Sequence, residues 1–249
     1  MDRILVIGGA GGIGSAIVDR YHRKGMYVIV GDIDKGVGER LLSKYPTNTE
    51  FQYVDLLDTI SMEEFRKRIY DNHDYLTHLV SLAGGAVEGE FGKLEQTSKE
   101  GISDSIDLNL KSHLYLIKDF VPLLEKAPQE NRSIVLMSSI NAQKDFGLPA
   151  YSAAKAGMYG MMYALTSELG EKDIRINTVS PGTVPTPRTL EQPKDFLGIA
   201  KGTALGRLAT VDDIADAVYA VTHELKAMTG QDITIDCGQV RKPGKWRTI

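Results

Sequence analysis

The sequence is poor in several features, and each absence excludes a class of protein. Its 249 residues include a single cysteine, Cys237, which excludes both an internal disulfide framework and a multi-cysteine metal site. No run approaches the ~18 consecutive apolar residues of a membrane-spanning helix. The N-terminal apolar run passes at once into glycines, without the cleavage site of a signal peptide. The five histidines show no H-E-x-x-H spacing and no G-x-S-x-G segment occurs, so we predict neither a metal site nor a serine hydrolase.

The charges are also nearly balanced, with 29 Lys and Arg against 33 Asp and Glu and a formal net charge of −4. Without a basic surface field, a nucleic-acid partner is not expected. Hydrophobic residues make up 42% of the chain, which is enough for a sizeable core and excludes a disordered chain. We therefore expect a globular, cytoplasmic protein that acts on a small molecule and binds neither nucleic acid nor membranes.

Short β-branched segments alternate with longer helical ones along the chain. Most of the short segments are apolar at nearly every position, which is typical of strands buried on both faces of a parallel sheet. The alternation predicts one doubly wound, Rossmann-type α/β domain over residues 1–249, with a mostly parallel seven-stranded sheet and helices on both faces. The expected strands are Arg3–Ile7, Tyr27–Gly31, Phe51–Val54, His78–Leu82, Ile134–Ser138, Arg175–Val179 and Ile233–Asp236. The expected helices are Gly12–Lys24, Lys35–Tyr45, Ser61–Asn72, Ser98–Glu125, Tyr151–Glu171 and Val211–Leu225.

Three places depart from this regular pattern. Residues 183–207 contain three prolines and no clear periodicity, and so long a loop predicts a lid over the substrate. Pro122 predicts a kink or an early end in the helix that contains it. The basic tail at residues 241–249 is irregular, as expected of a solvated terminus or a subunit contact.

A glycine-rich turn follows the first expected strand and opens the first expected helix. Within Gly8–Gly14, the glycines Gly8, Gly12 and Gly14, with Ile13 between the last two, follow a G-x-x-x-G-x-G spacing. Missing side chains let the backbone approach a pyrophosphate, and the N–H groups of a helix start favour its negative charge. The turn therefore predicts a dinucleotide site.

Other strand ends extend this predicted site. Asp32 ends the second strand, 18 residues beyond the last glycine of the turn. A carboxylate there can accept hydrogen bonds from both hydroxyls of an adenosine ribose and repels a 2′-phosphate, so it favours NAD over NADP. We expect Asp55 and Leu56 near the adenine, and Ala83 and Gly84 near a ribose.

Tyr151 and Lys155 are spaced i and i+4, on one face of an expected helix. A free tyrosine has a pKa of about 10, and a neighbouring cation favours the phenolate. Lowering that pKa to about 7 requires roughly 4 kcal/mol, at about 1.36 kcal/mol per unit. Such a phenol can exchange a proton with a substrate oxygen while hydride moves to or from a nicotinamide.

Two further positions carry polar side chains toward the same predicted site. Ser138 and Ser139 end the fifth strand, at the sheet edge where doubly wound folds bind ligands, and a hydroxyl there can hold a substrate oxygen. Asn109 lies in an otherwise apolar helical stretch. Because a buried amide must be hydrogen-bonded, Asn109 either tethers a water near the lysine or satisfies backbone groups.

Together these motifs resemble the short-chain dehydrogenase/reductase family, from Arg3 to about Gly238, and Pro181–Thr186 matches the family's P-G-x-x-x-T segment. The resemblance implies an oxidoreductase and a homotetramer, built through the long helices at 98–125 and 151–171 and the C-terminal strand.

The resemblance also implies roles for individual residues. Tyr151 would be the acid/base, and Lys155 would bind the nicotinamide ribose and lower the Tyr151 pKa. Asn109 would hold a relay water, while Val184 and Thr186 would hold the nicotinamide end.

Three departures from the family pattern stand beside these matches. Ile7 and Leu82 replace a threonine and an asparagine that the family commonly has at those points. The usual thirteen-residue spacing to Tyr151 selects Ser138 as the catalytic serine, whereas the end of the strand selects Ser139. We favour Ser139, because strand register fixes which side chain faces the site.

The leading prediction is an NAD-dependent oxidoreductase that interconverts a secondary alcohol and a ketone on a small or medium substrate. Its alternatives are an NADPH-linked ketoacyl-type reductase and a non-catalytic dinucleotide-binding regulator. The regulator is favoured only by the departures at Ile7 and Leu82.

Overall fold

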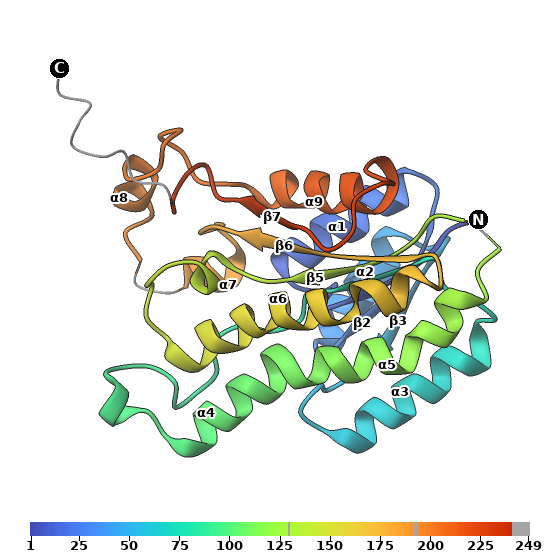
Figure 1. Ribbon diagram of the computed structural model, residues 1–249, viewed down its shortest axis with the longest axis horizontal. Coiled ribbons are helices and arrows are strands. Elements are labelled where there is room, and N and C mark those ends of the chain that lie inside the picture. The colour runs from blue at the N-terminus through green and yellow to red at the C-terminus, as the bar shows by residue number, and fades with distance from the viewer. Residues whose placement is uncertain (129, 192–193, 241–249) are drawn as a thin grey trace.

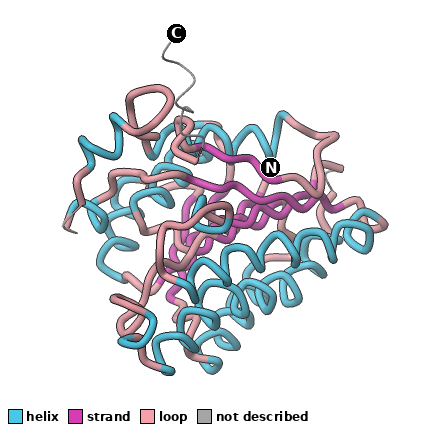
Figure 2. Tube along the Cα trace, turned by 60° about the vertical axis from the view of Figure 1, so that its left-hand side comes forward, coloured by secondary structure: helices cyan, strands magenta, loops and turns pink. Residues whose placement is uncertain are grey.

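The computed structural model describes residues 1–128, 130–191 and 194–240, so the tail at 241–249 lies outside the described residues. One seven-stranded sheet lies between two layers of helices (Figure 1, Figure 2). Its strands run in the order β3-β2-β1-β4-β5-β6-β7, and every pair is parallel. This confirms the predicted single α/β domain.

The strands are β1 (Arg3–Ile7), β2 (Tyr27–Asp32), β3 (Thr49–Tyr53), β4 (His78–Ser81), β5 (Arg132–Met137), β6 (Ile174–Pro181) and β7 (Asp232–Ile235). Among the strands, β3 and β5 start furthest from their expected positions. Each begins two residues earlier than predicted. β3 is an edge strand that pairs only with β2, and it starts with the polar residues Thr49 and Glu50. A search for apolar runs misses such a start.

The long helices lie at the expected positions, but π-helical turns interrupt the one expected at 98–125 and end the one expected at 211–225, where Ala220–Glu224 follows the final α-helix. The helices are α1 (Gly12–Arg23), α2 (Lys35–Lys44), α3 (Thr59–Asn72), α4 (Lys99–Ile106), α5 (Ser112–Glu125), α6 (Pro149–Gly170), α7 (Pro187–Leu190), α8 (Phe196–Lys201) and α9 (Val211–Tyr219). A π-helical turn, Asp107–Lys111, separates α4 from α5. α5 continues through Pro122, so the predicted early end of this helix is wrong. Val121, Leu123 and Leu124 around the proline are buried in the core, and this packing holds the helix together there.

The expected irregular loop at residues 183–207 contains the short helices α7 and α8. The side chain of Thr186 caps α7 by accepting from the Thr189 N–H, and Asp195 caps α8 by accepting from the Gly198 N–H. Each helix is too short to produce a periodic apolar pattern, which is why the sequence predicted a loop.

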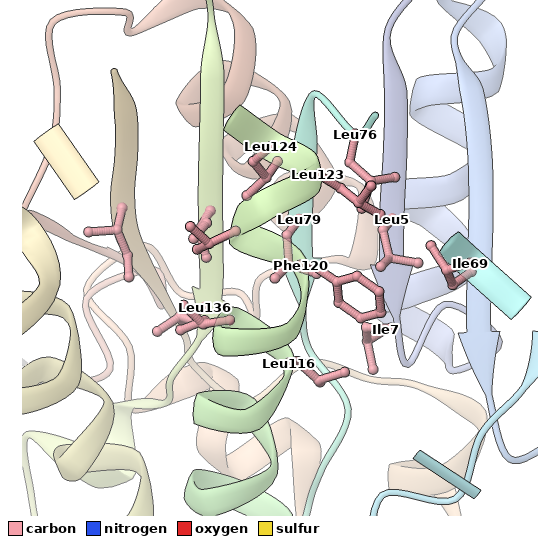
Figure 3. Close-up of a cluster of buried hydrophobic side chains, with 14 of the residues drawn as sticks. Leu5, Ile7, Ile69, Leu76, Leu79, Leu116, Phe120, Leu123, Leu124 and Leu136 are labelled. Atoms are coloured by element: carbon pink, nitrogen blue, oxygen red, sulfur yellow. The ribbon is translucent and has the colours of Figure 1, made fainter. Parts of the chain in front are cut away.

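Two hydrophobic clusters cover the two faces of the sheet. Along β1, Leu5 and Ile7 join one cluster while Ile4 and Val6 join the other, since successive side chains of a strand point to opposite faces. Figure 3 shows the first cluster, in which Phe120 of α5 lies close to Ile7. No helix in the described parts of the chain is long and apolar enough to cross a membrane.

We expect Phe120→Ala to lower the free energy of unfolding by about 3–5 kcal/mol, because it leaves a cavity beneath α5. Phe120 is 1% exposed and packs edge-to-face against Phe65, with ring centroids 5.9 Å apart. Urea unfolding measures the change. Leu114→Ala, on the exposed side of the same helix, is the matched control and is expected to change stability by no more than about 0.5 kcal/mol. Equal losses in the two variants would contradict the assigned core.

Candidate active site

A cleft of about 980 Å³ opens at the carboxyl ends of the strands. It lies where the strand order reverses, because β1 pairs with β2 on one side and with β4 on the other. The ends of β4, β5 and β6, the start of α6 and the segment around α7 and α8 form its walls. Its lining includes Ile13, Gly84, Ser139, Tyr151, Lys155 and Thr186.

The glycine turn closes one end of this cleft and has no room for side chains. Gly8 has a φ of +84°, and a Cβ atom on it would lie 2.6 Å from the Ala83 nitrogen. A Cβ on Gly14 would collide with the Gly8 carbonyl oxygen, and one on Gly12 would lie 2.8 Å from Cβ of Thr186. No described side chain caps the start of α1. These free N–H groups and the close backbone fit a pyrophosphate.

Asp32 lies beside this turn, at the end of β2. Its carboxylate accepts hydrogen bonds from the N–H of Ala10 at 2.9 Å and the N–H of Asp34 at 3.0 Å. Each oxygen takes one of these bonds, so both keep capacity to accept from hydroxyl groups. The structure therefore holds a fixed, negatively charged acceptor next to the glycine turn.

The other predicted strand-end residues are mainly turn-forming in this structure. Asp55 accepts from the Leu57 N–H at 2.9 Å, and Leu56 is buried. The N–H groups of Leu82 and Ala83 both donate to the Ile7 carbonyl, at 2.9 and 3.0 Å. Main-chain bonds thus hold the turn at the two positions, Ile7 and Leu82, that depart from the family pattern.

Asn109 lies in the π-helical turn and is fully buried. Its amide donates to the carbonyls of Gly85 and Ser105, both at 3.0 Å, and accepts from the Gly85 N–H at 2.8 Å. A Cβ on Gly84 would collide with Oδ1 of Asn109. Of the two alternatives left by the sequence, the side chain satisfies backbone groups and fixes the Gly84–Gly85 loop.

The two serines at the end of β5 face different partners. Ser138 donates its hydroxyl hydrogen to the main-chain carbonyl of Lys155 at 2.8 Å. The Ser139 hydroxyl donates to Oδ1 of Asn141 at 3.3 Å and accepts from the Asn141 N–H at 3.2 Å. Both serines line the cleft, but only Ser139 acts on the phenol of Tyr151, whose pKa it lowers.

Lys155 is 2% exposed, and its ammonium donates to the Met137 carbonyl at 2.9 Å. Burial without a carboxylate partner among the described residues lowers the pKa of Lys155 to about 7. Its Nζ lies 5.6 Å from the centroid of the Tyr151 ring.

Burial raises the pKa of Tyr151. The Ser139 hydroxyl and the charge of Arg188 act against this rise, while the negative charge of Glu90 adds to it. The loss of hydration therefore acts more strongly on the phenol than these opposing groups do. The lowering of this pKa by Lys155 together with a bound, positively charged nicotinamide stays a prediction.

Three further residues lie near the site, and none of them belongs to one of the motifs described above. Glu90, 1% exposed, accepts a short hydrogen bond from the backbone N–H of Tyr151, in the first turn of α6. Arg188 donates to the carbonyls of Gly84 and Ala86, at 3.1 and 2.9 Å. Both side chains come from segments outside the long helices, so only the folded structure reveals their partners.

The third is His113, which is fully buried one helical turn after Asn109. Its Nε2 lies 3.0 Å from the Ala83 carbonyl, which can only accept, so Nε2 carries the proton and Nδ1 accepts from the Ser81 hydroxyl at 2.7 Å. Burial, and then the charge of Lys155, lowers the pKa of His113 to about 3. This imidazole is therefore neutral and supports the loop after β4. Its i, i+4 spacing from Asn109, on one face of a helix, was the one feature of the sequence that could have pointed to it.

We expect the stability of the protein to rise with pH above 7 because of Lys155. Its pKa is about 7 in the folded state against an ordinary value of 10.5, so the unfolded chain binds more protons between these values. Relative to Lys155→Met, the natural chain should gain on the order of 1 kcal/mol per pH unit between pH 7 and 9. Urea unfolding of both proteins across this range measures the difference, and parallel stability curves would contradict the lowered pKa.

A Rossmann-type sheet, with a glycine turn, a partly buried tyrosine and a buried lysine around one cleft, defines a dinucleotide-dependent oxidoreductase. A family model described as Enoyl-(Acyl carrier protein) reductase matches residues 8–239. The chain belongs to the short-chain dehydrogenase/reductase family, whose coenzyme is NAD or NADP, and it is an oxidoreductase that acts on CH–OH groups, on alcohol or ketone substrates. This assignment replaces the non-catalytic regulator.

Characterised relatives resemble it along nearly their whole length. The 3-oxoacyl-(acyl-carrier-protein) reductase FabG of Thermotoga maritima is 29% identical, over 95% of this chain and 96% of its own. The 2,5-dichloro-2,5-cyclohexadiene-1,4-diol dehydrogenase LinX of Sphingobium indicum is 30% identical, over 94% of each chain. An oxidoreductase of this family from Burkholderia thailandensis has a crystal structure that matches with a TM-score of 0.85 at 28% identity, covering 96% of this chain and 92% of that one.

Proposed function

We propose that this protein is an NAD-dependent dehydrogenase that interconverts a secondary alcohol and a ketone on a small or medium substrate. The observation that carries the proposal is that Ser139, Tyr151 and Lys155 line one cleft, with Nζ of Lys155 5.6 Å from the centroid of the Tyr151 ring. Asp32 at the end of β2 supports the choice of NAD.

The residues around the cleft suit the parts of the coenzyme. The N–H groups of Gly8–Gly14 would hold the pyrophosphate, with Asp32 on the adenosine ribose and Asp55 and Leu56 toward the adenine. Lys155 would hold the nicotinamide ribose, with the Ala83–Gly84 backbone beside it, and Val184 and Thr186 the nicotinamide end. When bound, the oxidised coenzyme accepts a hydride and adds a positive charge to the cleft.

The protein's own side chains handle the proton. The Ser139 hydroxyl holds the substrate oxygen by a hydrogen bond, and the phenolate oxygen of Tyr151 takes the hydroxyl proton of an alcohol substrate. In the reducing direction the phenol donates that proton to the carbonyl oxygen. The ammonium of Lys155 favours the phenolate once the cleft carries further positive charge. Asn109 acts by fixing the Gly84–Gly85 loop, since its amide groups are already paired.

Other parts of the proposal concern the lid and the assembly. Residues 183–207, which contribute Arg188 and Ile199 to the cleft wall, would cover the substrate. Exposed apolar side chains on α5 and α6, among them Tyr115 and Tyr163, support the homotetramer implied by the family resemblance. The cytoplasmic location expected from the sequence belongs to the same proposal.

Tyr151→Phe should abolish turnover and leave NAD binding nearly unchanged, because it removes only the hydroxyl that moves the proton. A screen of alcohols with NAD⁺ and of ketones with NADH, read by NADH absorbance, measures turnover, and NADH titration measures binding. Tyr75→Phe, which removes a hydroxyl that donates to the Met1 carbonyl outside the cleft, is the matched control. An active Tyr151→Phe protein would exclude this mechanism.

Asp32 should set the coenzyme preference. We expect NADH to bind more tightly than NADPH, because the Asp32 carboxylate repels a 2′-phosphate. Asp32→Asn keeps an acceptor but removes the charge, so it should reduce the preference for NADH by about tenfold or more, or about 1.4 kcal/mol. Asp58→Asn, at the cap of α3, is the control. Fluorescence titration of both coenzymes measures the preference.

A second candidate is the NADPH-linked ketoacyl-type reductase, which the similarity to the Thermotoga maritima reductase favours. Tighter binding of NADPH than of NADH by the natural chain, with reduction of a ketoacyl thioester, would select this candidate over the first.

Glu90 should raise the pH at which Tyr151 loses its proton. Its buried carboxylate accepts from the Tyr151 N–H and adds to the raised pKa of the phenol, while Arg188 presents the opposing charge. Glu90→Gln keeps an acceptor without the charge, so the rise of alcohol oxidation with pH should move to lower pH. Glu88→Gln, exposed on the same loop, should leave the profile unchanged. Identical pH profiles for Glu90→Gln and the natural chain would contradict this role.

A further inference from the structure

Three potential metal ligands lie close together at the amino-terminal ends of the strands, at the other end of the sheet from the cleft. Asp2 immediately precedes β1, His78 begins β4, and His223 lies in a π-helical segment, Ala220–Glu224, that follows α9. One ligand atom from each residue lies within 4.8 Å of the other two. In the described part of the chain, this is the one group of three such side chains.

His78 is fully buried and only half satisfied. Its Nδ1 is hydrogen-bonded to the Ser133 hydroxyl at 2.8 Å, but its Nε2 has no hydrogen-bond partner among the described residues. Buried polar atoms are almost always paired, so an orphaned ring nitrogen that faces two other ligand side chains indicates a missing partner.

The hydrogen bond of His223 through Nδ1 leaves its Nε2 facing Asp2, in the same group of side chains. The Thr222 hydroxyl lies 2.9 Å from the Val218 carbonyl and 2.7 Å from Nδ1 of His223. When the hydroxyl donates to that carbonyl, it accepts from Nδ1, and Nε2 of His223 keeps a lone pair. This Nε2 makes no hydrogen bond within the described residues and faces the Asp2 carboxylate. The Tyr219 ring stacks on the imidazole at 4.8 Å and fixes its orientation.

We propose that Asp2, His78 and His223 form a binding site for a zinc-type divalent metal ion, with both Nε2 atoms and the Asp2 carboxylate as ligands and a water in the fourth position. Two imidazoles and a carboxylate are a common donor set for zinc, and tetrahedral bonds of about 2.0–2.1 Å place ligand atoms about 3.4 Å apart. Nε2 of His223 lies 3.4 Å from Oδ2 of Asp2.

The surroundings of the site agree with this assignment. The hydroxyls of Ser133 and Thr222 on the outer ring nitrogens are the partners that orient histidine ligands in metal sites. Within the described chain, Arg175 is the one nearby cation that acts against positive charge at His78, and its guanidinium is held by the carbonyls of Val221 and Thr222, both at 2.9 Å. Asp2 is partly exposed, so an ion can enter from solvent.

The site would be structural. It would join the start of the chain, β4 and the segment after α9, at the amino ends of the strands and away from the coenzyme cleft. No spacing motif revealed it, because positions 2, 78 and 223 meet only in the folded sheet. The sequence-based prediction of no metal site rested on such motifs alone.

The test is titration of tag-free, chelator-treated protein with Co²⁺, followed by Zn²⁺. We expect one equivalent of Co²⁺ with the visible absorption of tetrahedral coordination, its displacement by Zn²⁺, and a rise in Tm with Zn²⁺. His223→Asn keeps a donor for Thr222 but loses the ligand nitrogen, and Asp2→Ala loses the carboxylate with little risk to folding. Each should weaken metal binding by at least about tenfold.

His22→Asn, at a histidine far from the group, is the matched control and should bind Co²⁺ like the natural chain. Absence of the tetrahedral spectrum, or equal Co²⁺ affinity in the natural chain and both ligand variants, would overturn the proposal and leave a hydrated histidine pair. NADH titration of the same samples keeps this result separate from that of the coenzyme cleft.

Discussion

The burial of Lys155 is the constraint on which the arrangement of the cleft depends. Its ammonium donates to the Met137 carbonyl at the end of β5, and its own carbonyl accepts from Ser138, one residue further along. These two bonds fasten α6 to β5. Ser138 faces the helix backbone, and the next residue, Ser139, acts on the phenol of Tyr151. Glu90 accepts from the backbone N–H of that tyrosine at the start of α6.

The same burial gives the cleft an electrostatic state that suits a charged coenzyme. It lowers the pKa of Lys155 and raises the pKa of Tyr151, so both side chains move toward their neutral forms near neutral pH. His113 is neutral as well. An acid–base role for Tyr151 therefore requires added positive charge, which is what the oxidised nicotinamide carries. Proton transfer and coenzyme binding would be coupled through this one constraint.

The sequence was informative where local chemistry decides the structure. The apolar runs located β1 and β2, and the glycines of Gly8–Gly14 marked the turn between strand and helix. The i, i+4 spacing identified Tyr151 and Lys155, which the structure places in one cleft. These features depend on neighbours within a few residues, so a pattern in the sequence reveals them.

Features decided by tertiary contacts were out of reach. The polar start of β3 is held by pairing with β2, and the turn around Pro122 by the core beneath it. The raised pKa of Tyr151 follows from burial, which no spacing expresses. Glu90 acts on that tyrosine from a distant segment of the chain.

The most direct test of the central claim is a measurement of the Tyr151 pKa in the free and the NAD⁺-bound protein. Ultraviolet difference titration can follow the phenolate, with the Tyr151→Phe protein identifying its signal. The account predicts a pKa above the ordinary value of about 10 in the free protein and a fall toward neutrality when NAD⁺ binds. The same pKa in both states would contradict the coupling of coenzyme charge to the proton on Tyr151.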